Sequence, residues 1–204
     1  MFTGLIRECA RTLSYKGNIL WLSAQYRPNI GDSIAVNGAC LTVVEAKTGG
    51  FKVELSHESR ETLATENFKG LVHIEPAMVI GSRVDGHLLQ GHVDAVGEIT
   101  SIEKDENATN FFVKTQKDIM KFISPKGSIA IDGVSLTVND VGEDDTFRLT
   151  IISHTMRQTL FSAYKVGRRV NIETDMIARY LFNFAQNKDG VLKWNDVDRM
   201  VALY

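Results

Sequence analysis

Residues 33–45 read SIAVNGACLTVVE, and residues 128–140 read SIAIDGVSLTVND. Seven of the thirteen positions are identical, and others exchange similar residues, such as Val36 for Ile131 and Asn37 for Asp132. Typical residue frequencies would give about one identity in an alignment of this length. The chain therefore contains an internal repeat, and this repeat is the basis for predicting its fold.

The repeat extends along the chain on both sides of this segment. The other matched segments, in order, are residues 2–6 with 89–93, 56–63 with 153–160, and 72–78 with 170–176. The offset between the copies grows from 87 to 98, and we place the largest insertion, as a loop, in the polar stretch 103–110. The sequence thus predicts two copies of one unit, residues 1–86 and 87–184, and a tail over residues 185–204.

Each copy carries the pattern of an all-β domain. Short β-branched or alternating runs, such as residues 52–55 and 148–152, are bounded by glycine and polar turns. Asn37-Gly38 and Asp132-Gly133 each separate two apolar runs, which is the signal of a two-residue hairpin. Only 3 prolines accompany 16 glycines, as expected where paired strands need their amide donors. We expect a small closed antiparallel barrel of five to six strands in each copy.

The end of the chain has a different pattern. Apolar residues recur at helical spacing from about residue 175, with Thr174 or Asp175 available as the N-cap; they are Met176, Ile177, Tyr180, Leu181 and Phe184. A second short stripe runs from Trp194 to Tyr204, with Asn195 as its cap. We interpret this region as an oligomerisation element, and the alternative is a helix that packs back on its own barrel.

Composition limits the classes of protein that the chain can belong to. A formal net charge of −2 gives no basic surface for nucleic acid, and 44% hydrophobic residues exclude a disordered chain. Two cysteines, Cys9 and Cys40, form neither a disulfide framework nor a zinc motif. Charged residues interrupt the N-terminal apolar run and no stretch is long enough to span a membrane, so we expect a cytoplasmic protein.

Polar residues within the apolar repeat are the first candidates for chemistry. Cys40 and Thr42 are two residues apart, so they share one face of a strand, and the second copy places Ser135 and Thr137 there. Such sites would bind two similar ligands in similar poses while differing in nucleophilic power. The structural alternative is that the cysteine is a small core residue and that the threonines reflect β propensity.

The histidines are the second set of candidates. His87 and His92 lie at the glycine-rich junction of the two copies. Two interpretations are open for them, as a proton shuttle or as solvated histidines of a linker. Their spacing does not suit a metal site. His57 and His154 occupy equivalent positions, which indicates either a role in the fold or a duplicated ligand contact. We interpret His73 as a surface strand residue and Asp175 as a cap of the tail helix.

Five motifs, in order, resemble the riboflavin synthase family. They are MFTGLI at 1–6, VNGACLTV at 36–43, GHLLQGHVD at 86–94, IDGVSLTV at 131–138 and VNIE at 170–173. The resemblance covers residue 1 to about residue 180, and it implies two six-stranded Greek-key barrels and a C-terminal helix that assembles a homotrimer. Two departures are the absence of the family's proline in residues 56–59 and 153–156, and a longer, more apolar tail.

The resemblance also implies the reaction. Two molecules of 6,7-dimethyl-8-ribityllumazine dismutate by transfer of a four-carbon unit, which gives riboflavin and 5-amino-6-ribitylaminouracil. No metal or organic cofactor takes part. The site would form where the N-terminal barrel of one subunit meets the C-terminal barrel of its neighbour. Lumazine synthase is a candidate partner, and neither nucleic acid nor a membrane is expected.

Site residues are carried over from the family position by position. They are Ser33, Cys40, Thr42 and His92 on the N-barrel side, Lys126, Ser135, Thr137, Ile152, Thr155 and Asp175 on the C-barrel side, and Phe2, Thr3 and Gly4 at the edge. We expect His92 to act as acid or base, and Cys40 and Ser135 as nucleophiles or hydrogen-bonding groups. Thr42 and Thr137 would contact the ring, and Lys126 and Asp175 would bind or polarise the substrate.

Two other functions compete with the enzyme. One is a non-catalytic lumazine- or flavin-binding protein of the same fold, a kind that binds its ligand in one barrel only. The other is a structural β-barrel adaptor, which leaves the paired polar segments unexplained. Both copies here keep the segment around Cys40 or Ser135, which favours the enzyme.

Overall fold

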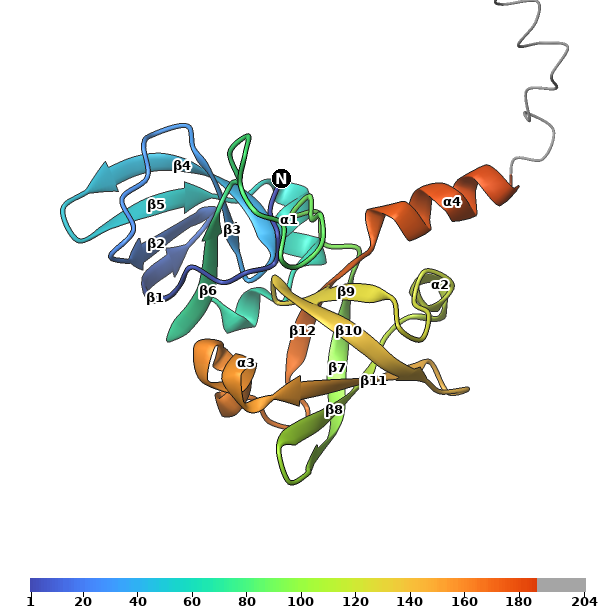
Figure 1. Cartoon of the computed structure of the whole chain (residues 1–204). Coiled ribbons are helices and arrows are strands. Elements are labelled where there is room, and N and C mark those ends of the chain that lie inside the picture. Colours follow the sequence, from blue (N-terminus) through green and yellow to red (C-terminus); the bar gives the residue numbers. More distant parts are fainter. Residues whose placement is uncertain (187–204) are drawn as a thin grey trace, which may run out of the picture.

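The computed structural model describes residues 1–186, which form two closed antiparallel barrels and a C-terminal helix (Figure 1). The first barrel consists of β1 (Glu8–Lys16), β2 (Ile19–Ser23), β3 (Ser33–Val36), β4 (Ala39–Lys47), β5 (Gly50–Glu54) and β6 (Leu71–Pro76). The second consists of β7 (Ala95–Lys104), β8 (Ala108–Lys114), β9 (Ser128–Ile131), β10 (Val134–Val141), β11 (Thr146–Ile152) and β12 (Arg169–Thr174). The predicted pair of six-stranded barrels is confirmed.

Short helices fill several connections; those after β5 and β11 lie at matching places in the two copies, whereas the helix between β8 and β9 is found in the second copy alone among the described residues. They are α1 (His57–Thr62) and η1 (Thr65–Asn67) in the first copy, and α2 (Lys117–Met120), α3 (Ser153–Gln158) and η2 (Leu160–Ala163) in the second. Neighbouring strands follow the order β1-β2-β5-β4-β3-β6 in the first barrel, and the second barrel repeats this order with β7 to β12. Helix α1 is capped by Ser56, whose side chain accepts the amide of Ser59.

The two predicted hairpin turns are present and face each other. Asn37 and Gly38 have φ of 44° and 84°, and Asp132 and Gly133 have 45° and 81°, so all four residues have the positive φ of type I′ turns. A Cβ on Gly38 would lie 2.7 Å from the Gly133 amide nitrogen, so the turns meet where only glycine fits. The repeated Gly of the two segments therefore serves both the hairpin and the contact between barrels.

Each barrel encloses its own apolar core. Alternation along the strands directs every second side chain inward, as in β8, where Thr109, Phe111 and Val113 are buried. Representative core residues are Leu20, Leu22, Val36, Val53 and Ile74 in the first barrel, and Val113, Ile129, Val138, Leu149 and Ile172 in the second. Side chains at the outward positions of the same strands do not belong to the core, so they can line a binding site.

The inserted segment forms strand where a loop was expected. Residues 103–104 extend β7 and residues 108–110 begin β8, so the turn is confined to residues 105–107. The inward residues Thr109 and Phe111 continue the alternation of β8, and this burial favours pairing with β7 over a polar loop. The insertion therefore lengthens a hairpin.

His73 is buried, so its interpretation as a surface residue is wrong. Its side chain is only 1% exposed because β6 runs along the contact with the second barrel. Nε2 accepts the amide of Leu160 at 2.8 Å, so Nδ1 carries the proton and donates to the Asp132 carbonyl at 2.9 Å. Burial lowers the pKa of His73 to about 4, so the ring joins the two copies in its neutral form.

Helix α4 (Met176–Gln186) begins at the end of β12, and its far end points away from the two barrels (Figure 1). Asp175 is its cap, because the carboxylate accepts the amide of Ile177 at 2.8 Å. One side contacts the second copy, where Arg179 binds Asp94 and Phe182 meets Phe122 edge to face. The other side exposes its apolar residues, namely Ile177 (58%), Tyr180 (60%), Leu181 (63%) and Phe184 (67%).

Two sequence predictions about the end of the chain have different outcomes. The helix predicted from about residue 175 is present, and the alternative of a helix packed flat on its own barrel does not describe it. The second stripe, from Trp194 to Tyr204, lies outside the described residues.

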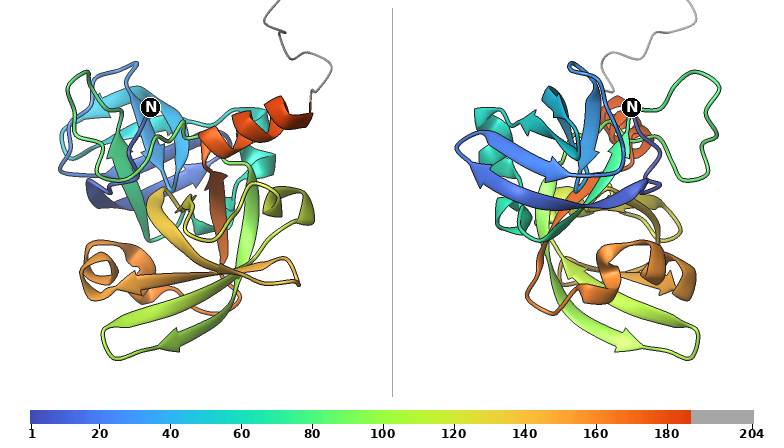
Figure 2. Two further views of the ribbon diagram at one scale, coloured as in Figure 1. Left: turned by 45° about the vertical axis from the view of Figure 1, so that its right-hand side comes forward. Right: turned by 90° about the vertical axis from the view of Figure 1, so that its left-hand side faces the viewer.

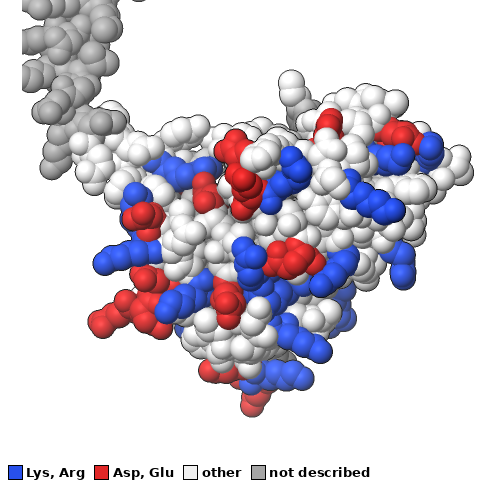
Figure 3. All heavy atoms as spheres, turned by 180° about the vertical axis from the view of Figure 1, so that it is seen from behind, with Lys and Arg blue, Asp and Glu red and all other residues white. Residues whose placement is uncertain are grey.

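One face of the described residues mixes both signs of charge. On the face seen from behind, Lys and Arg alternate with Asp and Glu and form no broad patch of one sign (Figure 3). Within residues 1–186, no helix has the length and apolarity that a membrane crossing requires.

Candidate active site

Two short segments, one from the start of each copy, cross over to the other copy. We call Phe2–Gly4 the first arm and Leu89–Gly91 the second arm. The arms pair with each other, since Phe2 and Leu89 exchange backbone hydrogen bonds of 2.8 and 3.0 Å. Beyond this bridge, the first arm accepts the amide of Ser135 at the Gly4 carbonyl (2.9 Å), and the second accepts the amide of Cys40 at the Gly91 carbonyl (2.8 Å). Each polar strand segment is thus covered by the arm of the opposite copy.

A buried glutamate anchors each arm to its own copy. Glu75 on β6 accepts the amides of Thr3 (2.7 Å) and Gly4 (3.0 Å). Glu173, its equivalent on β12, accepts the amides of Gln90 (2.7 Å) and Gly91 (3.0 Å). Burial raises the pKa of both carboxyls, that of Glu173 to about 7, while the amide donors oppose this shift.

Glycine is required where the arms touch the strands. Gly4 and Gly91 have φ of 76° and 78°, a conformation that L side chains rarely adopt. A Cβ on Gly4 would lie 2.5 Å from the Ser135 Cβ, and one on Gly91 would lie 2.5 Å from the Cys40 Cβ. The glycines of both motifs therefore allow the arm backbones to lie directly against the candidate side chains.

The first pocket lies between β4, α1 and the second arm, and has a volume of about 390 Å³. Cys40 and His92, both predicted site residues, line it together. The other lining residues are Ala39, Glu58, Ser59, Thr62, Leu63, Gly91 and Val93. Cys40 is half-buried on the outward face of β4, and His92 is exposed, so both are accessible to a ligand.

The second pocket occupies the equivalent place between β10, α3 and the first arm, and has a volume of about 430 Å³. Of the predicted residues, Gly4, Ser135 and Thr155 line it. The other lining residues are Leu5, Ile6, Val134, His154, Gln158 and Thr159. Both pockets fall within the size range of small-molecule sites.

Three of the aligned positions that line both pockets differ in the chemical group they carry. Cys40 of the first corresponds to Ser135 of the second, Glu58 to Thr155, and His92 to Leu5. At these positions the first pocket offers a thiol, a carboxylate and an imidazole, and the second offers two hydroxyls and an apolar side chain. Outside these positions, His154 gives the second pocket an imidazole of its own. Two chemically similar ligands would meet different groups in the two pockets.

A histidine adjoins the second pocket from the junction of the copies. His87 Nδ1 lies 2.7 Å from Ser135 Oγ, and the ring is half-buried. Burial lowers the pKa of His87, and the negative charge of Asp175 partly opposes this shift. The structure thus brings Ser135 and Asp175 together around a residue of the junction motif.

Other predicted residues lie beside the pockets without lining them. Thr42 and Thr137 lie two residues beyond Cys40 and Ser135 on the same outward strand faces. Ser33 pairs with Thr42 across the β3–β4 ladder, and the Lys126 amide donates to Val138, next to Thr137. The remaining three are Ile152, exposed at the end of β11, and Phe2 and Thr3, buried within the first arm.

Some residues around the pockets were missed by sequence reasoning. Glu58 and Ser59 in the first pocket were not predicted as site residues, but they could have been found from the repeat, because aligned segments place α1 and α3 against equivalent strands. His154, which the sequence offered as one of two possible ligand contacts, lines the second pocket. His57 begins α1 and lies outside the first pocket, so the paired histidines do not make a duplicated contact there. Within residues 1–186, no three His, Cys, Asp or Glu side chains are placed to hold a metal ion.

Known proteins match this chain over most of its length. The lumazine binding domain model matches twice, at residues 3–77 and 90–175. Riboflavin synthase of Photobacterium phosphoreum is 39% identical over 191 residues, which is 89% of this chain and 87% of that protein. Riboflavin synthase of Bacillus subtilis (strain 168) is 40% identical over 193 residues, which is 90% of this chain and 89% of that protein.

Solved structures agree on the fold. LumP complexed with riboflavin has a TM-score of 0.75 at 21% identity, and the match covers 85% of this chain and 99% of that chain. LumP complexed with 6,7-dimethyl-8-(1'-D-ribityl) lumazine has a TM-score of 0.72 at 20% identity, with the same coverage. With the double domain match and the riboflavin synthases at about 40% identity, these findings establish that the chain belongs to the riboflavin synthase family of lumazine-binding-domain proteins.

Proposed function

We propose that this chain is a riboflavin synthase, which converts two molecules of 6,7-dimethyl-8-ribityllumazine into riboflavin and 5-amino-6-ribitylaminouracil by transfer of a four-carbon unit. The observation that carries the proposal is the pair of matched pockets, of about 390 and 430 Å³, in two homologous barrels. A reaction between two identical molecules needs two similar binding sites. The duplicated fold provides them.

Unequal pockets suit a reaction in which identical molecules take different roles. One lumazine must lose a proton from its position-7 methyl group, and the other must accept a nucleophile at a ring carbon. In the first pocket, Cys40 and His92 place a thiol and an imidazole beside the same space. We assign His92 as an acid or base and Cys40 as a nucleophile or hydrogen-bonding group.

In the second pocket, Ser135 is assigned as the corresponding nucleophile or hydrogen-bonding group, and Thr155 as a substrate contact. Thr42 and Thr137 extend the two outward faces and would contact the ring, with Ser33 and Lys126 beside them. Asp175 is assigned to act through its negative charge, which opposes the lowering of the pKa of His87 by burial beside the second pocket. Phe2 and Thr3 hold the first arm in place, so their role in binding is indirect.

Bringing the two lumazines together requires that a first pocket faces a second pocket. We propose a homotrimer in which the N-terminal barrel of one subunit meets the C-terminal barrel of its neighbour. The exposed apolar side of α4 supports this assembly, because a patch of four large apolar side chains on a protein surface marks a contact with another protein chain. Fixing both reactants would lower the barrier by up to roughly 7–11 kcal/mol. A cytoplasmic location and a complex with lumazine synthase stay predictions.

The competing function is a lumazine- or flavin-binding protein without activity. LumP, which shares the fold, has been crystallised with riboflavin and with the lumazine. Identity to LumP is 21%, against 39–40% to the riboflavin synthases, and both pockets of this chain retain a nucleophilic side chain. These observations favour the enzyme.

Turnover of one compound separates the two functions. The purified protein is incubated with 6,7-dimethyl-8-ribityllumazine as sole substrate, with EDTA present, and both products are quantified by absorbance and chromatography. We expect one riboflavin for every two lumazines consumed. Tight binding of lumazine without formation of riboflavin would show a binding protein and contradict the proposed function.

A further inference from the structure

We propose that His87 is a positioning residue of the second pocket, which acts through Ser135 by accepting its hydroxyl proton as the Ser135 oxygen attacks the bound substrate. The inference rests on the proposed function. It names the base for the attack of Ser135 on the substrate, a role for which the pockets alone offer several candidate residues. It also separates the two histidines of the junction, because His92 lines the first pocket and His87 serves the second.

The geometry is that of a serine and its base. The distance of 2.7 Å between His87 Nδ1 and Ser135 Oγ is within the range for proton transfer between such groups. Gly86 makes this approach possible, since a Cβ there would lie 3.0 Å from Ser135 Oγ and 2.1 Å from the Thr3 carbonyl oxygen. The contacts of Gly86 and His87 with Ser135 thus explain why the junction motif places a glycine before this histidine.

The surroundings of His87 favour a neutral ring that can gain a proton. Burial lowers its pKa, so the ring is uncharged and able to act as a base at neutral pH. Asp175 is the charged group that opposes this shift, and its carboxylate would stabilise the imidazolium once formed. When Nδ1 accepts the serine proton, the hydrogen lies on Nε2, which is buried and has no hydrogen-bond partner among residues 1–186.

The first pocket contains no equivalent pair. Within the described chain, the Cys40 thiol makes no hydrogen bond to a histidine, although His92 lines the same pocket. A thiol needs less help than a hydroxyl, because its ordinary pKa of about 8.5 leaves some thiolate at neutral pH. A serine in the same position needs a base, and among the described residues Ser135 is the one of the two nucleophiles that is hydrogen-bonded to a histidine.

The step balances without a further reactant. The Ser135 Oγ–H bond breaks, its proton moves to His87 Nδ1, and the oxygen forms a bond to an electrophilic carbon of the lumazine ring. The π electron pair of that carbon moves into the conjugated ring. Nothing is oxidised or reduced. Return of the proton and cleavage of the carbon–oxygen bond regenerate both side chains later in the cycle.

The alternative is that the His87–Ser135 hydrogen bond only ties the junction to β10. His87→Asn separates the two roles, because an asparagine can place a hydrogen-bonding atom near the position of Nδ1 but cannot accept a proton. We expect kcat of H87N to fall by about 100-fold or more with KM within about threefold, as for loss of a general base. The pH dependence of kcat should also lose its imidazole limb.

Rescue provides the second measurement. In the double variant H87N/S135C, the nucleophile is a thiol, which depends less on a base than a hydroxyl does, so we expect kcat about tenfold above that of H87N. Circular dichroism and riboflavin binding establish that each variant is folded. The proposal is overturned if H87N keeps more than a third of the wild-type kcat, or if the thiol gives no rescue in a folded double variant. Absence of turnover in the wild type would instead overturn the proposed function and, with it, this role for His87.

Discussion

At the scale of single residues, the site depends on two glycines as much as on two nucleophiles. Cys40 and Ser135 take the same place on β4 and β10, and each amide donates to the carbonyl of an arm glycine. Gly91 and Gly4 combine a positive φ with contact against the nucleophile's own Cβ. The arm position, and with it the wall of each pocket, is therefore sensitive to a single added methyl group.

Gly91→Ala tests this sensitivity, and Gly17→Ala is its matched control. Both glycines have positive φ, 78° and 61°, but a Cβ on Gly17 would meet nothing within 4 Å. Both variants should lose about 1–2 kcal/mol of stability from backbone strain. Only G91A should also lose activity, by about tenfold or more in kcat/KM, because its arm must move off Cys40. Equal activity of the two variants in the riboflavin assay would contradict this role of the second arm.

The buried His73 gives a prediction about pH. Its folded pKa of about 4 lies below the ordinary value of 6.5, so the unfolded chain binds more protons between these values. The contribution of His73 to stability is therefore present above about pH 6.5 and is lost as the pH falls toward 4. NMR of the folded protein should show the His73 ring neutral down to at least pH 5. A titration midpoint near 6.5 would mean that the ring is not held between the two copies.

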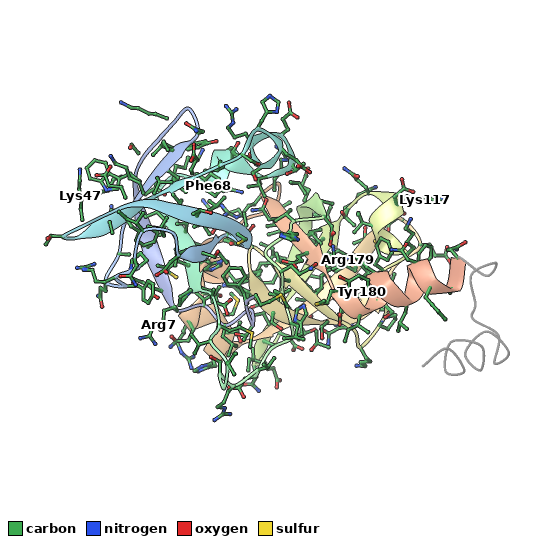
Figure 4. All side chains as sticks on the ribbon, turned by 90° about the horizontal axis from the view of Figure 1, so that it is seen from above. Arg7, Lys47, Phe68, Lys117, Arg179 and Tyr180 are labelled. Atoms are coloured by element: carbon green, nitrogen blue, oxygen red, sulfur yellow. The ribbon has the colours of Figure 1, made fainter. Side chains whose placement is uncertain are left out.

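At the scale of elements, the glutamates at the ends of β6 and β12 link strands to arms. Glu75 and Glu173 are aligned in the repeat, and each accepts two arm amides. The second arm is also tied to α4, since Arg179, near the base of that helix, donates to Gln90 at 2.9 Å and to Asp94 at 2.7 Å (Figure 4). Strand, arm and helix therefore form one connected support for the first pocket.

Hydrogen exchange of the two nucleophile amides can show that each glutamate supports a particular pocket. Glu173→Gln leaves one acceptor for two amides, so the second arm should loosen and the Cys40 amide should exchange faster. Glu75→Gln should affect the Ser135 amide more. The arms are bonded to each other, so each variant will also show a smaller effect on the opposite amide. Equal effects of both variants on both amides would contradict separate anchoring.

Elements differed in how far the sequence could predict them. The hairpins at Asn37-Gly38 and Asp132-Gly133, the strands of residues 52–55 and 148–152, and the start of α4 depend on local patterns, which single sequences carry well. The crossing of the arms depends on hydrogen bonds between residues far apart in the sequence, such as Ser135 with Gly4 and Cys40 with Gly91, and no periodicity encodes them. The burial of His73 was missed for the same reason, because its partners belong to the other copy.

At the scale of the whole molecule, the two copies are joined at their turns, arms and buried polar side chains. Asn171 donates to the Asn37 carbonyl and accepts the Ala64 amide, so one side chain spans the contact between barrels. The loop between β6 and the second arm stands away from the body (Figure 2). We propose residues 86 and 87 as the boundary between the two units, with the arms crossing it in both directions.

Helix α4 keeps an apolar side that this joined pair of barrels leaves uncovered. Its exposed residues Ile177, Tyr180, Leu181 and Phe184 follow the spacing of one helical face, while Arg179 and Phe182 contact the second copy. An apolar face that is anchored at its base and exposed along its length fits a contact with a second copy of the chain. The assembly of the site then depends on the helix, although no pocket residue lies on it.

The double variant L181K/F184K should therefore convert the proposed trimer to monomers. Each substitution would place a charge in the apolar contact, where burial of an unpaired ammonium is strongly unfavourable. Asn183→Lys is the matched control, since Asn183 is an exposed polar residue of the same helix. Light scattering should show monomers only for the double variant, and its turnover per chain should fall as the protein is diluted, because each site needs two chains. A double variant that remains trimeric would place the contact elsewhere, and a monomeric wild type with full activity would show that the two lumazines react within one chain.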